Sequence, residues 1–229
     1  MKYDIFLFDA DDTLFDFYHT GQKCLIKAFS DIGITINESD YDVYSEINQK
    51  RWDLFSLGKI DKQEVVIGRF EEFSAVKGIS FDVFKIYELY ESNLSKTCIL
   101  LPDTNEVLSR LKSEGKRIFL ITNGLKAVQR GRLAVSDISD YFEDVFISDE
   151  IGFKKPSKEY FDYVASHIKG FDKSKTLIVG DSLVADIMLG INNNVDTCHF
   201  RKIILPYQEN AKPTYTIDKL TDIFKICEQ

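Results

Sequence analysis

Short apolar segments without polar alternation recur along this chain, and helical patterns separate them. Five of these segments are rich in β-branched or aromatic residues and read as buried strands, at 3–9, 117–122, 144–148, 176–181 and 195–200. Apolar residues on both faces of a strand are typical of parallel strands that helices cover on both sides. The helical patterns lie at 105–114, 125–135, 157–167 and 183–191. We therefore expect an α/β fold with a doubly wound, Rossmann-like parallel sheet.

The stretch from residue 15 to 96 differs, because it contains no convincing strand pattern. Its apolar residues recur at helical spacing in four groups, which include Leu25, Tyr44, Phe70 and Tyr87. This spacing predicts four amphipathic helices. We assign residues 15–96 to an inserted α-helical cap domain, and residues 1–14 and 97–229 to the α/β core domain. An insert after the first strand commonly covers the site at the strand ends.

Composition and charge exclude several functional classes. With 229 residues, 44% of them hydrophobic, the chain can bury a core domain and an insert. The net charge of −8 argues against a nucleic-acid polymer or an anionic membrane as partner, since both need a basic surface. The four cysteines are far apart and suggest reduced thiols. The apolar run "IFLF" before Asp9 is too short for a signal peptide or a membrane span, so we expect a cytoplasmic protein.

Polar side chains gather where the predicted strands end. Ligands of open α/β sheets bind outside the carboxyl ends of the strands, so these side chains are the candidate site. They are Asp9 and Asp11 after the first strand, Thr122 and Asn123 after the second, Lys155 in the loop after the third, Asp181 after the fourth, and Asp186 in the following helix.

The negative charges of this set exceed its positive charge, so a further cation is needed. Four carboxylates face one lysine, and such a cluster would raise its own pKa values and repel an anionic substrate. A hard divalent cation removes both difficulties, and a ligand set of oxygen atoms without His or Cys indicates Mg²⁺. Once a metal is bound, a phosphate group becomes a plausible ligand.

Four short motifs, in order along the chain, resemble those of the haloacid dehalogenase-like hydrolase superfamily. "DADDT" at residue 9 resembles its DxDxT signature, and "ITN" at residue 121 resembles its second motif. The lysine before Pro156 resembles the third motif, and "GDSLVAD" at residue 180 resembles the fourth. The order and the spacing agree over nearly the whole chain, and the helical insert is similar to that of the helical-cap phosphatase branch.

The resemblance implies a phosphatase that acts through an aspartyl-phosphate. Asp9 would be the nucleophile, and Asp11 would act first as the general acid for the leaving alkoxide and then as the base that activates water. The Thr122 hydroxyl and the Asn123 backbone N–H would bind phosphate oxygens. Lys155 would neutralise the nucleophile and the charge that develops on the transferred group.

The resemblance also implies the ligands of Mg²⁺. A carboxylate oxygen of Asp9, the backbone carbonyl of Asp11 and the carboxylate of Asp181 would hold the ion, and Asp186 would orient or complete that set. Three neighbouring charged residues are expected to have other roles. Asp12 and Asp16 would belong to the turn and its solvated flank, and Lys154 would be solvated.

The cap narrows the expected substrate. Residues 47–73, together with "ITNGLKAVQRGRL" and "ISDEIGFKKP", closely resemble bacterial pyrimidine 5′-nucleotidases, a group that hydrolyses nucleoside monophosphates, including non-canonical pyrimidine ones. Polar or stacking candidates for the leaving group are Asn48, Arg51, Trp52, Lys59 and Arg69. Arg69 could instead pair with Glu72 on its own helix. Opening of the cap would use hinges near 14–16 and 97–101.

Other functions remain open at this point. A sugar-phosphate or phosphoglycolate phosphatase of the same superfamily is the main alternative. A 2-haloacid dehalogenase is less favoured, because those members of the family carry an aromatic residue where this chain has Asp11. A non-catalytic binding module is also less favoured, because the motif set is intact. The sequence permits either a monomer or a homodimer.

Overall fold

The structure, a computed structural model, describes residues 2–200 and 211–228. Within this part of the chain a parallel sheet has the strand order β3-β2-β1-β4-β5-β6. The strands are β1 (Ile5–Phe8), β2 (Arg117–Thr122), β3 (Asp144–Ile147), β4 (Thr176–Gly180), β5 (Asp196–Phe200) and β6 (Tyr215–Ile217). The first five confirm the predicted strands. The sequence does not predict β6, because three residues are too few to show a periodicity.

Strand β1 lies at the centre of the sheet, and the order of the strands reverses beside it. Phe8 pairs with Leu120 of β2 on one side and with Val179 of β4 on the other. The chain builds outward through β2 and β3, and then returns to the other side of β1 with β4. A doubly wound sheet opens a crevice at such a switch point. The carboxyl ends of β1 and β4 therefore mark the expected place of a ligand.

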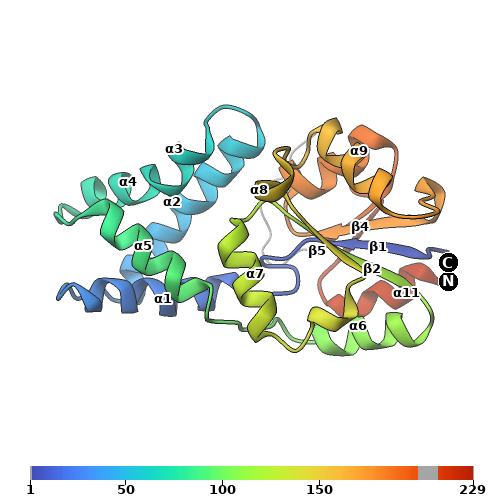
Figure 1. Ribbon diagram of the computed structural model, residues 1–229, viewed down its shortest axis with the longest axis horizontal. Coiled ribbons are helices and arrows are strands. Elements are labelled where there is room, and N and C mark those ends of the chain that lie inside the picture. The colour runs from blue at the N-terminus through green and yellow to red at the C-terminus, as the bar shows by residue number, and fades with distance from the viewer. Residues whose placement is uncertain (1, 201–210, 229) are drawn as a thin grey trace.

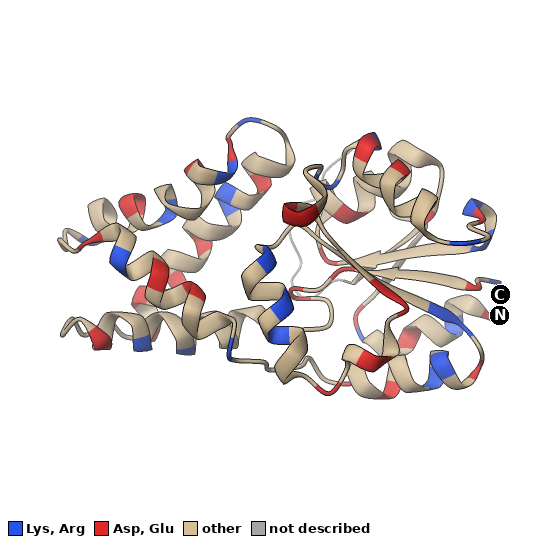
Figure 2. Cartoon of the chain, viewed as in Figure 1, with Lys and Arg blue, Asp and Glu red and all other residues tan. Residues whose placement is uncertain are grey.

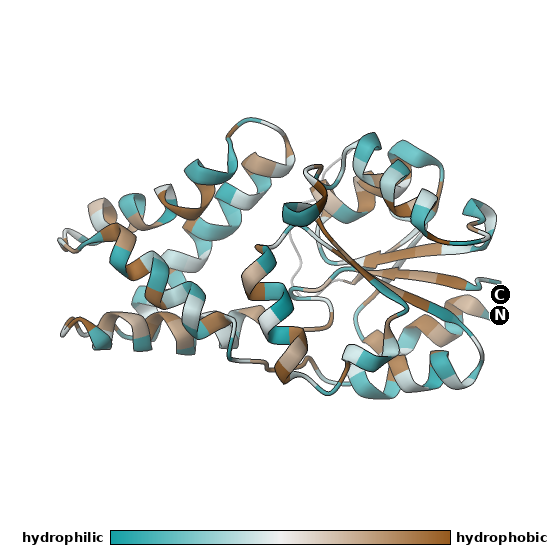
Figure 3. Ribbon diagram, viewed as in Figure 1, coloured by the Kyte–Doolittle hydropathy of each residue, from teal (hydrophilic) through white to brown (hydrophobic). Residues whose placement is uncertain are grey.

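Helices cover both faces of the sheet, as the unalternating strands predict. Phe6 and Phe8 belong to one buried cluster with residues of α6 and α11, whereas Ile5 and Leu7 belong to another with residues of α9 and α10. The brown strands of Figure 3 show this apolar layer. The helices of this part are α6 (Thr104–Ser113), α7 (Lys126–Val135), α8 (Ser148–Ile151), α9 (Lys158–His167), α10 (Met188–Asn193) and α11 (Ile223–Cys227). Single helical turns lie at Ser139–Tyr141, Lys173–Lys175, Leu183–Ile187 and Leu220–Asp222.

A second, all-helical part follows β1 and lies beside the carboxyl ends of the strands (Figure 1). Its helices are α1 (Phe17–Asp31), α2 (Glu38–Ser56), α3 (Lys62–Val66), α4 (Gly68–Lys77) and α5 (Val83–Leu94). Helices α1, α2, α4 and α5 enclose an aromatic core of their own that includes Tyr44, Phe70 and Tyr90. The sequence predicts four helices here, and that number is wrong, because the third predicted helix is divided at Ile67. The domain boundaries 1–14, 15–96 and 97–229 stay a prediction, and the last segment includes residues 201–210 and 229, which lie outside the described residues.

Two chain segments run side by side between the parts. Phe15 forms an antiparallel bridge with Leu100, the Leu101 N–H donates to the Leu14 carbonyl at 2.9 Å, and the Asp16 N–H donates to the Ile99 carbonyl at 2.8 Å. Helix α7 of the sheet part also contacts the helical part, because Val128 belongs to the buried cluster of the latter. Charged residues of both signs alternate along the outer helices of both parts (Figure 2).

Candidate active site

The turn after β1 places Asp9 and Asp11 at the crevice. The Asp9 N–H donates to the Val179 carbonyl at 2.8 Å, which ties Asp9 to β4. Asp12 adopts a left-handed conformation with φ of 57°, which Asp and Asn tolerate better than most residues. Asp16 is buried and accepts from the His19 N–H at 3.1 Å as the N-cap of α1. The expectation that Asp16 is solvated is therefore wrong.

Lys155 is the buried cation at the centre of the site. Its ammonium donates to Asp9 Oδ1 at 2.6 Å, to Asp186 Oδ1 at 2.7 Å and to the Ile121 carbonyl at 3.0 Å. Burial opposes the charge of Lys155, but the carboxylates of Asp186 and Asp9 outweigh burial and raise its pKa above the ordinary value. Lys155 is therefore a permanent cation whose three protons all have acceptors.

The carboxylates around Lys155 are less favourably placed than Lys155 itself, because burial and their mutual repulsion disfavour their charged forms. Burial raises the pKa of Asp9 to about 7, although Lys155 opposes this shift. Burial also raises the pKa of Asp181 well above its usual range, and the charges of Asp9 and Asp186 add to that effect. Three carboxylates thus share one ammonium, and a further positive charge would relieve the repulsion between them.

Geometry and ligand chemistry both fit a hard divalent cation here. One carboxylate oxygen each of Asp9, Asp181 and Asp186 lies within 4.8 Å of the others. All the side-chain donors are oxygen atoms, which suits Mg²⁺. Asp186 is the least available of the three, because its oxygens already accept from Lys155 and, at 3.1 Å, from the Ser182 N–H.

Gly180 allows this arrangement because it has no side chain. A Cβ atom at residue 180 would lie 2.3 Å from Asp186 Oδ2. Only a residue without a side chain lets the Asp186 carboxylate pack against the end of β4. The glycine of the fourth motif therefore makes room for the aspartate of the same motif.

The ends of β2 and of the loop after β3 form the other wall. The Thr122 hydroxyl accepts from the Gly124 N–H at 3.0 Å. The Asn123 side chain accepts from the Lys155 N–H at 2.8 Å and donates to the Lys155 carbonyl at 3.0 Å. Asn123 thus fixes the backbone of Lys155 through its side chain, a role that the sequence does not predict.

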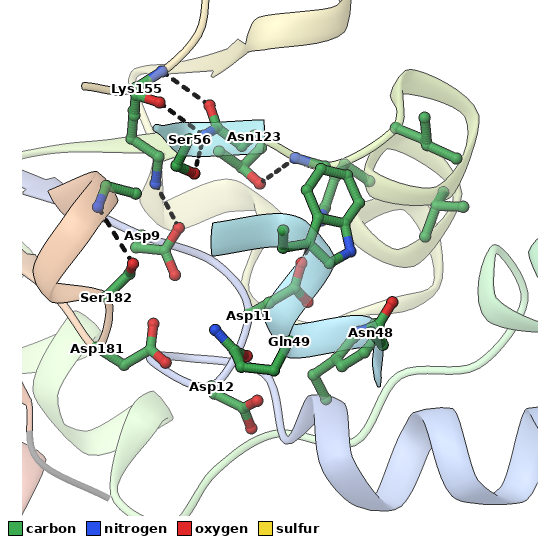
Figure 4. A pocket seen from close by; sticks show the side chains of 18 of the residues that line it. Asp9, Asp11, Asp12, Asn48, Gln49, Ser56, Asn123, Lys155, Asp181 and Ser182 are labelled. Carbon is green, nitrogen blue, oxygen red and sulfur yellow. Dashed lines mark hydrogen bonds and ion pairs between the residues drawn. The ribbon is translucent and has the colours of Figure 1, made fainter. Parts of the chain in front are cut away.

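One cavity brings together all seven residues that the sequence selects. Its lining includes Asp9, Asp11, Thr122, Asn123, Lys155, Asp181 and Asp186. Figure 4 shows Asp9 facing Lys155, with Asp181 and Ser182 across from it, and Asn48 and Gln49 of α2 on the side of the helical part. The arrangement combines a buried carboxylate, a second carboxylate, a cation and a group of carboxylate oxygens that could hold a metal ion.

Residues of the helical part form the remaining wall of the cavity. Asn48, Trp52 and Arg69 line it, together with Phe17, Ser56 and Glu91. Arg51 and Lys59, the other two candidates, do not line it. Arg51 instead pairs with Glu72 at 2.8 Å and donates to the Glu64 carbonyl, and Lys59 lines a separate groove.

Arg69 pairs with Glu91 and not with Glu72. It is buried, and all three of its nitrogens are bonded: Nε donates to the Val66 carbonyl at 3.2 Å, Nη1 to Asn48 Oδ1 at 2.9 Å, and Nη2 to Glu91. The interpretation that Arg69 pairs with Glu72 is therefore wrong, whereas contact of Arg69 with a substrate stays a prediction, because Arg69 also lines the cavity. Arg69 holds α2, α4 and α5 together and orients the Asn48 amide.

Two contacts join the helical part to the sheet part near the cavity. The Lys62 ammonium lies 2.7 Å from the Asp149 carboxylate. Lys154 donates to the Phe55 carbonyl, and its ammonium lies 3.5 Å from the centre of the Phe55 ring. Lys154 is thus partly buried, and the prediction that it is solvated is wrong.

Two further polar residues, Gln129 and Arg132 of α7, reach the site and are missed by the sequence reasoning. Gln129 Nε2 donates to Asp11 Oδ2 at 2.6 Å, and Arg132 Nη1 donates to Asp11 Oδ1. A spacing of three residues places both side chains on one face of the helix that follows "TNG". This spacing is a signal that could have selected them.

Among the described helices, none is long and apolar enough to cross a membrane.

Comparison with known proteins gives a consistent result. A sequence profile of the haloacid dehalogenase-like hydrolases matches residues 3–193. The chain is 33% identical to pyrimidine 5′-nucleotidase YjjG of Escherichia coli, over 97% of each chain. It is 33% identical to pyrimidine 5′-nucleotidase PynA of Streptococcus pneumoniae, over 97% of this chain and 94% of that one.

A third relative has a solved structure. The HAD-hydrolase YfnB of Bacillus subtilis is 35% identical over 98% of this chain and 95% of its own. Its crystal structure is described as bound to magnesium and as revealing interdomain movement. The structure of this chain superposes on it with a TM-score of 0.93, and the match covers 100% of each chain.

Proposed function

The chain belongs to the haloacid dehalogenase-like hydrolase family, and from this premise we propose that it is a Mg²⁺-dependent phosphatase of pyrimidine nucleoside 5′-monophosphates. The observation that carries the phosphatase chemistry is the Asp9–Lys155–Asp186 ion cluster beside Asp181. A carboxylate that would act as the nucleophile, a cation and carboxylate oxygens that would hold a metal line one cavity, and Asp11 lines the same cavity.

The proposed reaction begins at Asp9. A carboxylate oxygen of Asp9 attacks phosphorus, the bond from phosphorus to the nucleoside oxygen breaks, and Asp11 donates a proton to the leaving alkoxide. Water then attacks the aspartyl-phosphate, Asp11 takes a proton from that water, and inorganic phosphate leaves with the Asp9 carboxylate restored. The two half-reactions use the same Asp11 proton site in opposite directions.

The walls of the cavity support this chemistry. Lys155 holds Asp9 in position and compensates the charge on the transferred group, since its ammonium already lies 2.6 Å from Asp9 Oδ1. Thr122 and the Asn123 backbone N–H, which line the same cavity, would bind phosphate oxygens. Asp9, Asp181 and the Asp11 carbonyl would hold Mg²⁺, and Asp186 would orient or complete that set. When bound, the metal supplies charge neutralisation for the phosphoryl group.

The substrate class rests on the relatives and on the helical wall. Two relatives that match nearly the full length of the chain are named pyrimidine 5′-nucleotidases. The wall opposite Asp9 combines an indole, Trp52, with the amide of Asn48, whose Oδ1 is bonded to Arg69. Stacking on an aromatic ring and a hydrogen-bond donor suit a nucleobase. We further propose that residues 15–96 act as a cap domain that closes over the core domain of 1–14 and 97–229.

A substrate panel tests the proposal. We expect hydrolysis of dUMP, dTMP and UMP with Mg²⁺, weaker hydrolysis of AMP, phosphoglycolate and hexose phosphates, and none by Asp9→Asn. A preference for phosphoglycolate or a hexose phosphate would keep the phosphatase and overturn the nucleotide assignment. Failure to hydrolyse any phosphomonoester, p-nitrophenyl phosphate included, would overturn the phosphatase assignment itself.

A further inference from the structure

Asp11 is held by two residues of α7, and their arrangement concerns the proton-transfer step. Gln129 binds one carboxylate oxygen at 2.6 Å, and Arg132 binds the other. We propose that Gln129 and Arg132 are positioning residues for Asp11, which fix its carboxylate for proton transfer to and from the leaving-group oxygen. This inference rests on the proposed function, because it needs Asp11 to be the acid and base.

The bonding of Arg132 shows that its guanidinium is directed at Asp11. Arg132 is completely buried, yet its Nε and Nη2 have no hydrogen-bond partner within the described residues. Arg69, the other buried arginine among the described residues, has partners for all three nitrogens. A guanidinium that only joins helices is expected to be saturated as Arg69 is. The guanidinium of Arg132 is instead desolvated, and its hydrogen bond within the described residues goes to one carboxylate, that of Asp11.

Neighbouring groups keep Gln129 and Arg132 in place. The Arg132 guanidinium lies 4.4 Å from the centre of the Phe15 ring and 5.8 Å from that of Phe17. These rings belong to the segment that leads from Asp11 into α1. A Cβ atom at Gly124 would lie 2.3 Å from Gln129 Nε2, so the glycine after Asn123 leaves the space that Gln129 needs to reach Asp11.

Helix α7 also touches the proposed hinge. A Cβ atom at Gly131 would lie 2.4 Å from the Ser95 carbonyl oxygen, so α7 packs directly on the segment that leaves α5. The same helix that holds Asp11 therefore contacts Phe15 of one connecting segment and Ser95, which comes shortly before the other. Movement of the cap would therefore change the position of the Asp11 carboxylate through these contacts.

The test compares two leaving groups in the same enzyme preparation. The alkoxide of dUMP is a strong base and needs a proton as it leaves, whereas p-nitrophenolate is a weak base and leaves without one. Because kcat/KM reports only the steps up to formation of the aspartyl-phosphate, the later attack of water does not enter the comparison. A ratio of the two kcat/KM values is also independent of the fraction of enzyme that is folded.

We expect Arg132→Lys and Gln129→Met to lower kcat/KM for dUMP by about tenfold or more and that for p-nitrophenyl phosphate by less than about threefold, since general acids contribute about 10²–10⁴-fold. Gly124→Ala, which displaces Gln129, should change the ratio in the same direction. In an Asp11→Asn background, Arg132→Lys should add no further loss for dUMP. Arg130→Lys is the matched control, because Arg130 lies on the same helix and pairs with Glu150 at 2.6 Å.

Equal losses for both substrates in Arg132→Lys and Gln129→Met would overturn the positioning role and leave a structural one. Additive losses in the Asp11→Asn background would overturn it as well. These outcomes differ from failure of the proposed function, in which the wild-type enzyme itself would not hydrolyse dUMP.

Discussion

Replacing Asp9 by Asn should abolish turnover and also stabilise the metal-free protein. Asp9 is buried beside Asp181 and Asp186, and Lys155 supplies one positive charge against three carboxylates. Burial, opposed by Lys155 and reinforced by Asp186, raises the pKa of Asp9 from 3.8 to about 7. The ionised carboxylate therefore costs folding free energy that a neutral amide does not, and the amide oxygen can still accept from Lys155.

The magnitude follows from the two pKa values of Asp9. The difference between 3.8 and about 7 is about three pH units, and each unit is worth about 1.4 kcal/mol, which gives a cost of about 4 kcal/mol at pH 8. The folded carboxyl binds its proton more tightly than the unfolded one. The unfolding free energy of the wild-type protein therefore falls as the pH rises from about 4 through 7. We expect Asp9→Asn to be about 2–4 kcal/mol more stable at pH 8, with the difference vanishing near pH 4.

Urea unfolding in EDTA between pH 4 and 8.5 measures this difference. Asp31→Asn is a suitable control, because Asp31 pairs with Lys27 on an exposed turn of α1 and should change stability by less than about 1 kcal/mol at every pH. An Asp9→Asn variant that is no more stable than the wild type at pH 8 would refute the reasoning. So would a stability gain that does not depend on pH.

Three further perturbations have defined outcomes. Mg²⁺ at about 100 times its dissociation constant should stabilise the wild type by about 2.7 kcal/mol in a thermal shift assay and Asp9→Asn by less, and an equal gain would contradict the proposed ligand set. Lys155→Met should be inactive and about 3–5 kcal/mol less stable in urea unfolding, because two buried carboxylates lose their cation; an active variant would contradict its role. Arg69→Met should lower the free energy of unfolding in urea by a similar amount, because it leaves the largely buried Glu91 carboxylate without its cation. Lys62→Met should lower it by less than about 1 kcal/mol and should mainly raise KM. Equal losses of stability in the two variants would contradict this ranking.

The sequence predicts most residues of the candidate site because strand-end chemistry is local. A buried apolar strand, a polar residue at its carboxyl end and a following helix are readable from adjacent positions. Parallel connectivity then brings those ends to one edge of the sheet. Asp9, Thr122, Lys155 and Asp181 are therefore predictable as neighbours, and the structure places them in one cavity.

Side-chain partners across the helical part are not predictable in this way. Arg51 and Arg69 both look like candidates for the substrate, but Arg51 pairs with Glu72 and Arg69 with Glu91. The choice depends on how α2, α4 and α5 rotate about their axes when their aromatic residues pack. One helical repeat does not determine that rotation, since several faces of each helix carry charged residues.

The sequence by itself determined the α/β class, the order of the first five strands along the chain, and the acidic and basic residues at the strand ends, because each depends on local pattern and chain connectivity. Only the tertiary structure decided that Gln129 and Arg132 bind Asp11, that Gly124 and Gly180 make room for polar side chains, and that Lys154 contacts Phe55. These contacts join residues that are up to 121 positions apart. Their geometry is set by the packing of whole elements, which no single segment encodes.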